Sequence, residues 1–139
     1  MTSVVRWVEV HRLAVAGREA GIARDAGGRV GRVWLARSRF ADVARLAGQT
    51  LTLGEDASAF YQLGWARYAT GDRAGEAVTR YNVAMICRAR GELDRAVAEL
   101  EQVVELDRQV GHPDLRSDTE MLHRVRQELA SSDQGHGPP

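Results

Sequence analysis

The sequence predicts an all-α fold, a solenoid of antiparallel helix hairpins with about seven helices. Segments of the chain return at a constant offset: residues 10–14 resemble residues 43–47, and Val30-Gly31 resembles Leu63-Gly64. Apolar side chains recur every three or four positions, as on one face of a helix, and no stretch shows a convincing strand alternation. A fixed helical period of about 33 residues is typical of a solenoid, in which each repeat packs on its neighbours.

Three helical patterns make up the first part of the chain. The first covers residues 5–22, and we expect Gly27-Gly28 to separate it from the next. Residues 29–37 and 40–53 continue the spacing of apolar side chains that marks the buried face of a helix. A Gly-Glu-Asp sequence after residue 53 predicts the break that follows.

Four further helices are expected over residues 57–70, 76–90 and 92–110 and from Ser117 to about residue 130. Asp56 is placed to cap the first of them, because its carboxylate can accept a hydrogen bond from a free N–H of the first turn. Gly91 is expected to close the second, since glycine enters the left-handed conformation easily. Ser117 and Glu120 resemble a capping box that opens the last.

Length and composition fit one globular domain. The chain has 139 residues, of which 44% are hydrophobic and 27% charged, the balance of an ordinary folded protein. We expect residues 1–130 to form the helical domain. Residues 131–139 are rich in Gly, Pro and Ser and are expected to form a disordered tail.

Charge and cysteine content indicate the compartment and exclude some partners. Basic and acidic residues balance at 19 each, so net charge provides no attraction to nucleic acid or to an anionic membrane. The single cysteine, Cys87, cannot form an internal disulfide, which is typical of a reducing compartment. Arg6 and Glu9 interrupt the apolar residues near the N-terminus, so no signal peptide is expected. We therefore expect a cytoplasmic protein that binds neither nucleic acid nor membrane.

Two sets of motifs resemble the halves of a known repeat. The first set has an apolar residue followed by a small one: Gly27-x-x-Val30-Gly31-x-x-Trp34, Phe60-x-x-Leu63-Gly64 followed by Tyr68, and Arg80-x-x-Val83-Ala84-x-x-Cys87. The second set has two small or apolar residues four positions apart: Val10 and Ala14, Val43 and Ala47, Ala96 and Leu100. Together they resemble the first and second helices of the tetratricopeptide repeat, over roughly residues 5–110. The family resemblance implies a solenoid that binds proteins or peptides.

The chain departs from that family pattern in register. It begins with a helix of the second type, and the step from Leu63-Gly64 to Val83-Ala84 is about 20 residues, where the family has about 34. We interpret this slip as the loss of one second-type helix between residues 71 and 76. Solenoid stability depends on neighbouring interfaces, so this junction is the expected weak point.

No motif points to catalysis, a cofactor or a metal. Residues 27–31 approach a phosphate-binding glycine fingerprint, but Ala26 stands where the first glycine belongs and no strand precedes it, so a turn between helices is preferred. The spacing of His112 and His123 matches no metal-ligand pair on one helical turn. We interpret one further set of acidic residues as a solvated helix face: Asp94, Glu99, Glu101, Glu105 and Asp107. A non-enzymatic protein without cofactor or metal is expected.

In the family that the chain resembles, the inner face of the first-type helices lines a peptide-binding groove. Carried over to this sequence, that face comprises Arg29, Arg32, Tyr61, Gln62, Trp65, Tyr68, Tyr81, Asn82, Met85 and Arg88. Aromatic and methionine side chains would hold apolar anchors of a peptide, arginines would meet carboxylates, and the amides would pair with peptide backbone. The alternative is that Tyr61, Trp65 and Tyr81 only fill space between helices.

The function expected from these features is a protein–protein interaction scaffold that binds a peptide or a helix of a partner in a concave groove. Two alternatives stay open. The chain could be a detached regulatory or sensor fragment of a larger bacterial signalling protein or transcription regulator. It could instead self-assemble, with unmatched helices exposing apolar faces that pair between copies as a homo-oligomer.

Overall fold

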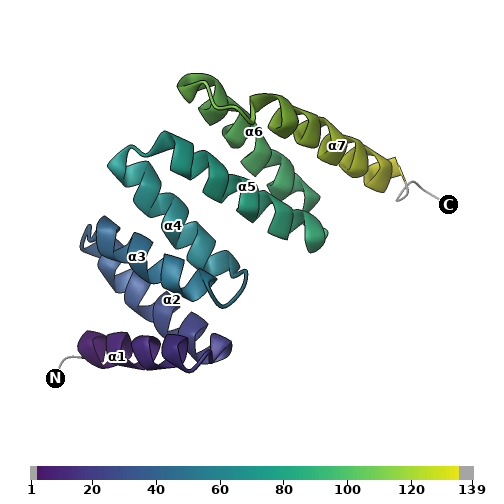
Figure 1. Cartoon of the computed structure of the whole chain (residues 1–139). Helices are drawn as coiled ribbons and strands as arrows, with labels where there is room; N and C mark the ends of the chain where they lie inside the picture. Colours follow the sequence, from purple (N-terminus) through teal and green to yellow (C-terminus); the bar gives the residue numbers. More distant parts are fainter. Residues whose placement is uncertain (1–2, 135–139) are drawn as a thin grey trace. The chain divides into compact units, whose positions relative to one another are not determined.

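The computed structural model describes residues 3–134, and these residues form seven helices and no strand. The all-α prediction is therefore confirmed for this part of the chain (Figure 1). The chain divides into two compact units, with the boundary between Asp72 and Arg73. This boundary lies at the junction where the sequence pattern indicates a lost helix. There α4 ends at Thr70 and α5 begins at Arg73, with no helix between them.

The first unit contains α1 (Ser3–Ala16), α2 (Ala20–Ala36), α3 (Phe40–Leu51) and α4 (Ala57–Thr70). Each helix contacts the next one along the chain, and α2 also contacts α4. Contacts between successive helices, together with a contact between alternate helices, are the arrangement of a helical solenoid.

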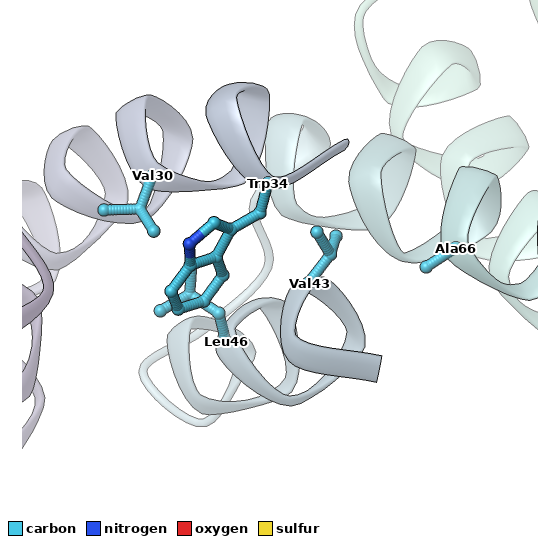
Figure 2. Packing of buried hydrophobic residues seen from close by; sticks show 5 residues of the cluster. All are labelled: Val30, Trp34, Val43, Leu46 and Ala66. Atoms are coloured by element: carbon cyan, nitrogen blue, oxygen red, sulfur yellow. The ribbon is translucent and has the colours of Figure 1, made fainter. Parts of the chain in front are cut away.

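The core of this unit lies between α2, α3 and α4. It consists of Val30, Trp34, Val43, Leu46 and Ala66 (Figure 2). The Trp34 indole extends from α2 toward α3, and the guanidinium carbon of Arg39 lies 4.5 Å from the centre of its ring. Trp7 and Phe40 are half-buried and pack against the cluster.

Gly27 lies inside α2 and is buried, so the expected break at Gly27-Gly28 is wrong. A Cβ atom at residue 27 would lie 2.9 Å from the Thr50 Oγ1 and 3.2 Å from the His11 Cδ2. The missing Cβ leaves room for a buried hydrogen bond from α1 to α3, between His11 Nε2 and Thr50 Oγ1 at 2.8 Å. The glycine is required here by a tertiary contact, and not by a turn.

The hydrogen bonds of Thr50 indicate that Nε2 of the His11 imidazole carries a proton. The Thr50 hydroxyl donates to the Leu46 carbonyl oxygen at 3.2 Å, so its oxygen accepts from His11 Nε2–H. Burial lowers the pKa of His11, because the charged imidazolium would lose its hydration. The ring is therefore a neutral core histidine.

Gly31 has a comparable role toward α4. A Cβ atom at this position would lie 2.0 Å from the Gln62 Oε1. Gln62 Nε2 donates to the Gly28 carbonyl oxygen at 3.2 Å. The close approach that requires glycine at residue 31 is thus made by the Gln62 side chain of α4.

The boundary between α1 and α2 lies at residues 17–19, so a single helix over residues 5–22 is also wrong. Arg18 takes a left-handed conformation with φ 56°, and the Glu19 N–H donates to the Ala14 carbonyl oxygen at 2.8 Å. Ser38, with φ 58°, follows the end of α2 in the same conformation. Neither position has the glycine that usually marks such a helix end. The sequence pattern therefore does not predict the boundary between α1 and α2.

The second unit contains α5 (Arg73–Ala89), α6 (Leu93–Val110) and α7 (Leu115–Gln134), with α6 contacting both neighbours. Arg80 joins α5 to α6, because its guanidinium donates to Glu76 at 2.9 Å and to Glu99 at 3.0 Å. Cys87 is buried in the core of this unit. Other buried side chains of this unit are Val83, Leu100, Val103 and Val125.

Three glycines and one aspartate end or begin helices. Gly71, Gly91 and Gly111 have positive φ and follow α4, α5 and α6 at equal intervals along the chain. Asp56 caps α4 as expected, with its Oδ2 accepting from the Ala59 N–H at 3.0 Å.

The last helix differs from expectation at both ends. α7 begins at Leu115, and the Ser117 hydroxyl donates to the Asp114 carbonyl oxygen at 3.0 Å, so no capping box forms with Glu120. The helix continues to Gln134, although residues 131–134 were assigned to the tail. The remaining tail residues, 135–139, lie outside the described residues. Among the helices described, none has both the length and the apolar character needed to cross a bilayer.

Replacing Gly27 by alanine tests whether the His11–Thr50 contact over α2 requires a residue without a side chain. The Gly27→Ala variant is expected to lower the free energy of unfolding by about 1–3 kcal/mol, because the methyl group overpacks the His11–Thr50 contact. Gly21→Ala in the same helix is the control. Its Cβ meets no atom within 4 Å, so better helix propensity should raise stability by about 0.5–1 kcal/mol. Urea unfolding followed by circular dichroism measures both, and equal shifts would contradict the packing argument.

Replacing Ser38 by glycine tests the left-handed helix end. The Ser38→Gly variant should raise the free energy of unfolding by about 1 kcal/mol, because glycine adopts positive φ without steric cost. Arg37→Gly is the control, since Arg37 has φ −98°. There the substitution adds only chain entropy to the unfolded state and should destabilise. Thermal unfolding of both variants checks the prediction, and a lower midpoint for Ser38→Gly would overturn it.

Candidate functional site

The groove residues predicted on α2 lie at the surface of the first unit. Arg29 and Arg32 are both exposed. The Arg29 guanidinium is paired with Asp25, at 3.2 Å between Nε and Oδ2, and its carbon lies 4.6 Å from the centre of the Trp7 ring. The Arg29 side chain therefore contacts Asp25 on its own helix and the Trp7 ring of α1 while it stays exposed.

The predicted residues of α4 divide into buried and exposed ones. Gln62 is buried beside Gly31, so it is not available to a peptide, contrary to its expected place in the groove. Tyr61 is half-buried. Trp65 and Tyr68 are 61% and 57% exposed, with ring centres 5.8 Å apart in an edge-to-face arrangement. These two aromatic rings form an exposed pair on α4.

In the second unit, Arg88 is engaged by α7. Its Nε donates to Glu128 Oε2 at 3.0 Å, its Nη2 makes a second, short contact with Glu128 Oε1, and its Nη1 lies 3.6 Å from the Met121 Sδ. The hydrogen bonds from Arg88 lower the pKa of Glu128. Met85 is half-buried. The Arg88 side chain therefore connects α5 to α7, and its charge is already paired.

Tyr81 and Asn82 line a pocket, which we call the Asp107 pocket. Its volume is about 260 Å³, and its walls come from all three helices of the second unit. The lining residues are Val78, Tyr81, Asn82, Asp107, His112, Asp114, Ser117 and Asp118. Two predicted groove residues are thus brought together with a group of acidic side chains that the sequence analysis did not connect with them.

Asp107 is the unusual member of this pocket. Its exposed fraction is 0%, and no N–H or hydroxyl of the described residues donates to either carboxylate oxygen when its acidic neighbours are ionised. It also lies in the last turn of α6, where the negative end of the helix dipole disfavours an anion. A buried carboxylate without donors is costly, because it has lost hydration and gained nothing in exchange.

Asp107 and burial change the pKa of the neighbouring Asp118. Burial, hydrogen bonding to Asp107 and the charges of Asp107 and Asp114 raise the pKa of Asp118 to about 7. A carboxylic acid at Asp118 can donate to Asp107, whereas a carboxylate cannot. Protonated Asp118 thus supplies a donor to Asp107, and its ionisation near neutral pH removes that donor and places two like charges side by side.

His112 lies near the acidic side chains without a hydrogen bond to Asp107. Its Nδ1 accepts a hydrogen bond from the backbone N–H of Asp114 at 3.1 Å. The same Nδ1 lies 3.9 Å from the nearest carboxylate oxygens of Asp107 and of Asp114, which is beyond hydrogen-bond distance.

The acidic cluster is not arranged as a metal site. Within residues 3–134, no group of three or more His, Cys, Asp or Glu side chains is placed to hold a metal ion. The pocket lining instead combines carboxylates with the amide of Asn82, the hydroxyl of Ser117 and the ring of Tyr81. Side-chain oxygens of these kinds accept hydrogen bonds from N–H donors.

The assignment of Asp107 to a solvated helix face was wrong, and the sequence contained a signal against it. Leu100, Val103 and Val104 are spaced as one buried stripe of α6, and Asp107 follows at the next position of that stripe. Glu99, assigned to the same face, is paired with Arg80. A charged residue in register with an apolar stripe is the pattern that marks a buried ionisable group.

Comparison of the chain with protein-family models, with curated proteins and with solved structures finds no match in any of the three.

Replacing Asp118 by asparagine tests the carboxylate pair. Since the pKa of about 7 exceeds the ordinary value of 3.8, the folded protein binds a proton that the unfolded chain lacks between these pH values. The wild-type free energy of unfolding should therefore lose up to about 1.4 kcal/mol per pH unit from this group as pH rises toward 7.

Asp118→Asn removes that loss, because an amide N–H donates to Asp107 at every pH. Its stability advantage over the wild type should grow between pH 5 and pH 8 in urea unfolding. Asp133→Asn, at an exposed position of the same helix, should track the wild type. A constant difference between Asp118→Asn and the wild type would show that Asp118 is ionised throughout.

Proposed function

We propose that this chain is a tetratricopeptide-like scaffold that binds a segment of a partner protein on the exposed surface of its first-type helices, without catalysing a reaction. The observation that carries the proposal is the exposed pair Trp65 and Tyr68 on α4. We place the interaction in the cytoplasm, since the single cysteine, Cys87, is buried and free and a reducing compartment maintains such a thiol.

Physical chemistry supports a binding role for the Trp65–Tyr68 pair. Large aromatic rings contribute most to a fold when they are buried, yet these two leave more than half of their surface in water. Tryptophan and tyrosine are enriched among the residues that dominate binding energy at protein interfaces, because they bury a large area with few rotatable bonds. Their edge-to-face contact preorganises the two rings and lowers the entropic cost of binding.

The repeat architecture supports the same role. Consecutive helices of the first unit hold α4 by its buried face, which includes Ala59, Leu63 and Ala66. A rigid helix presents side chains with less conformational loss than a loop does. Exposed aromatic residues on such a helix are suited to hold apolar side chains of a helix or an extended peptide.

Self-association is a second candidate, and it rests on a different helix. Val10 and Leu13 of α1 are 36% and 55% exposed and lie three positions apart on one face. An apolar strip of this kind can pair with the same strip of a second copy. Sedimentation velocity over a range of protein concentrations distinguishes the two candidates. A wild-type dimer that is lost in the Val10→Ser, Leu13→Ser double variant would favour self-association.

The proposal predicts that a partner depends on Trp65 and Tyr68. Affinity capture from the native host's lysate, quantified by mass spectrometry, compares the wild type with the Trp65→Ala, Tyr68→Ala double variant. We expect at least one protein to be retained by the wild type and depleted about tenfold or more with the variant, as for the loss of interface anchors.

The control for this experiment is Ile22→Ala with Val110→Ala, which removes two other exposed apolar side chains (51% and 40% exposed). Circular dichroism must show equal helicity for all three proteins. Retention that is the same for the double variant and the control would overturn the proposed role of the Trp65–Tyr68 pair.

A further inference from the structure

We propose that the Asp107 pocket binds the guanidinium group of an arginine side chain carried by the partner segment, with Asp107 as its principal acceptor. The inference rests on the proposed function for the source of the arginine, and on the pocket itself for the chemistry. It assigns a specific chemical feature to the partner, namely an arginine that enters the second unit.

The carboxylate of Asp107 has the properties of one half of a bidentate ion pair. Both of its oxygens lack donors once Asp118 is ionised, and the side chain is fully buried while lining the pocket. A guanidinium group offers parallel N–H donors in one plane, which match the two oxygens of a carboxylate. One arginine would thus satisfy both orphan acceptors and supply the missing positive charge.

The rest of the lining fits a guanidinium better than an anion or an apolar group. Asp114 and Asp118 add negative charge, and Asn82 and Ser117 add side-chain oxygens that accept hydrogen bonds from further N–H donors. Tyr81 contributes an aromatic ring, and guanidinium groups stack on such rings. An ammonium group carries the charge but lacks the planar pair of donors, so lysine is expected to bind less well.

The dimensions of the pocket favour one side chain over a whole ligand. Its volume of about 260 Å³ lies below the ~300–1,000 Å³ of pockets that enclose drug-sized molecules. Tyr81 and Asn82 connect the pocket to the α5 residues that the family resemblance places in a peptide-binding groove. An arginine of a bound peptide therefore suits this pocket better than a free metabolite.

A proton and the guanidinium compete for Asp107. The ionisable groups facing it are Tyr81 from α5, His112 and Asp114 from the turn after α6, and Asp118 from α7. Below its pKa of about 7, Asp118 is protonated and donates to Asp107. Above it, the carboxylate of Asp118 adds to the negative charge of Asp107 and Asp114, so arginine should bind more tightly at pH 8 than at pH 6.

The test titrates N-acetyl-L-arginine amide into the full chain at constant ionic strength, observed by ¹⁵N and carboxyl ¹³C NMR. We expect shifts at the Asn82 side chain and the Asp107 carboxyl, with a Kd on the order of millimolar at pH 8. Asp107→Asn should weaken binding about tenfold or more. Asp118→Asn should abolish the pH dependence and bind the probe at pH 8 about as weakly as the wild type does at pH 6, because its amide donates to Asp107 at both pH values. Asp94→Asn, at an exposed position of α6, is the matched control and should bind as the wild type does.

Three comparison ligands make the result decisive. N-acetyl-L-citrulline amide has nearly the same shape without the charge and should not bind. N-acetyl-L-lysine amide should bind more weakly than the arginine probe. Free L-arginine should bind no better than the capped probe, because both carry the same guanidinium and the same net charge, and the α-ammonium and α-carboxylate of the free amino acid lose hydration on binding. Tighter binding of free arginine would indicate a small-molecule ligand and overturn the assignment to a partner side chain.

The inference is wrong if the arginine probe produces no shifts in the pocket, if citrulline amide binds equally well, or if Asp107→Asn binds like Asp94→Asn. These outcomes are independent of the capture experiment, since no partner protein is present. Normal probe binding together with partner capture unaffected by Trp65→Ala, Tyr68→Ala would contradict the proposed function and leave the pocket chemistry intact.

Discussion

The first unit depends on the absence of a single carbon atom at Gly27. His11 of α1 and Thr50 of α3 meet over this residue, where a Cβ atom would collide with the Thr50 hydroxyl and crowd the His11 ring. Their hydrogen bond is fully buried, where a polar group without a partner would cost free energy. The pair therefore fixes the spacing and register of α1 and α3 relative to α2. Gly31 extends the same principle to α4, through the amide of Gln62. Apolar burial provides the driving force, and these two glycines select the geometry.

The second unit has a different polar interior. Arg80 joins two of its helices through a paired contact with Glu99, whereas Asp107 is buried without such a partner. A fold keeps an uncompensated buried carboxylate only when other interactions exceed its cost, and sites that violate local rules tend to be functional. The contrast between the satisfied His11–Thr50 pair and the unsatisfied Asp107 is what distinguishes a structural polar contact from a candidate binding site.

The helix ends explain which boundaries could be predicted. Gly71, Gly91 and Gly111 follow their helices in the left-handed conformation that glycine commonly adopts there. Arg18 and Ser38 adopt the same geometry with side chains that rarely do so. Local sequence preference therefore located the later boundaries and misplaced the first. The interval between successive glycines of this set equals the length of one helix with its turn. Because this interval is shorter than the tetratricopeptide period, comparison with that period makes the repeat look shifted in register.

The sequence by itself determined the helical class, the number of helices and most of their ends, because these follow from the spacing of apolar residues and from local capping. It placed Gln62 and Trp65 together in a groove, yet the first is buried and the second exposed, since α2 packs against the side of α4 that bears Gln62. Only the tertiary structure decided what Gly27 and Asp107 do. Glycine has the same local preference in a turn and in a close helix crossing, and aspartate has the same charge on a solvated face and in a pocket. Their roles depend on atoms contributed by helices distant in sequence.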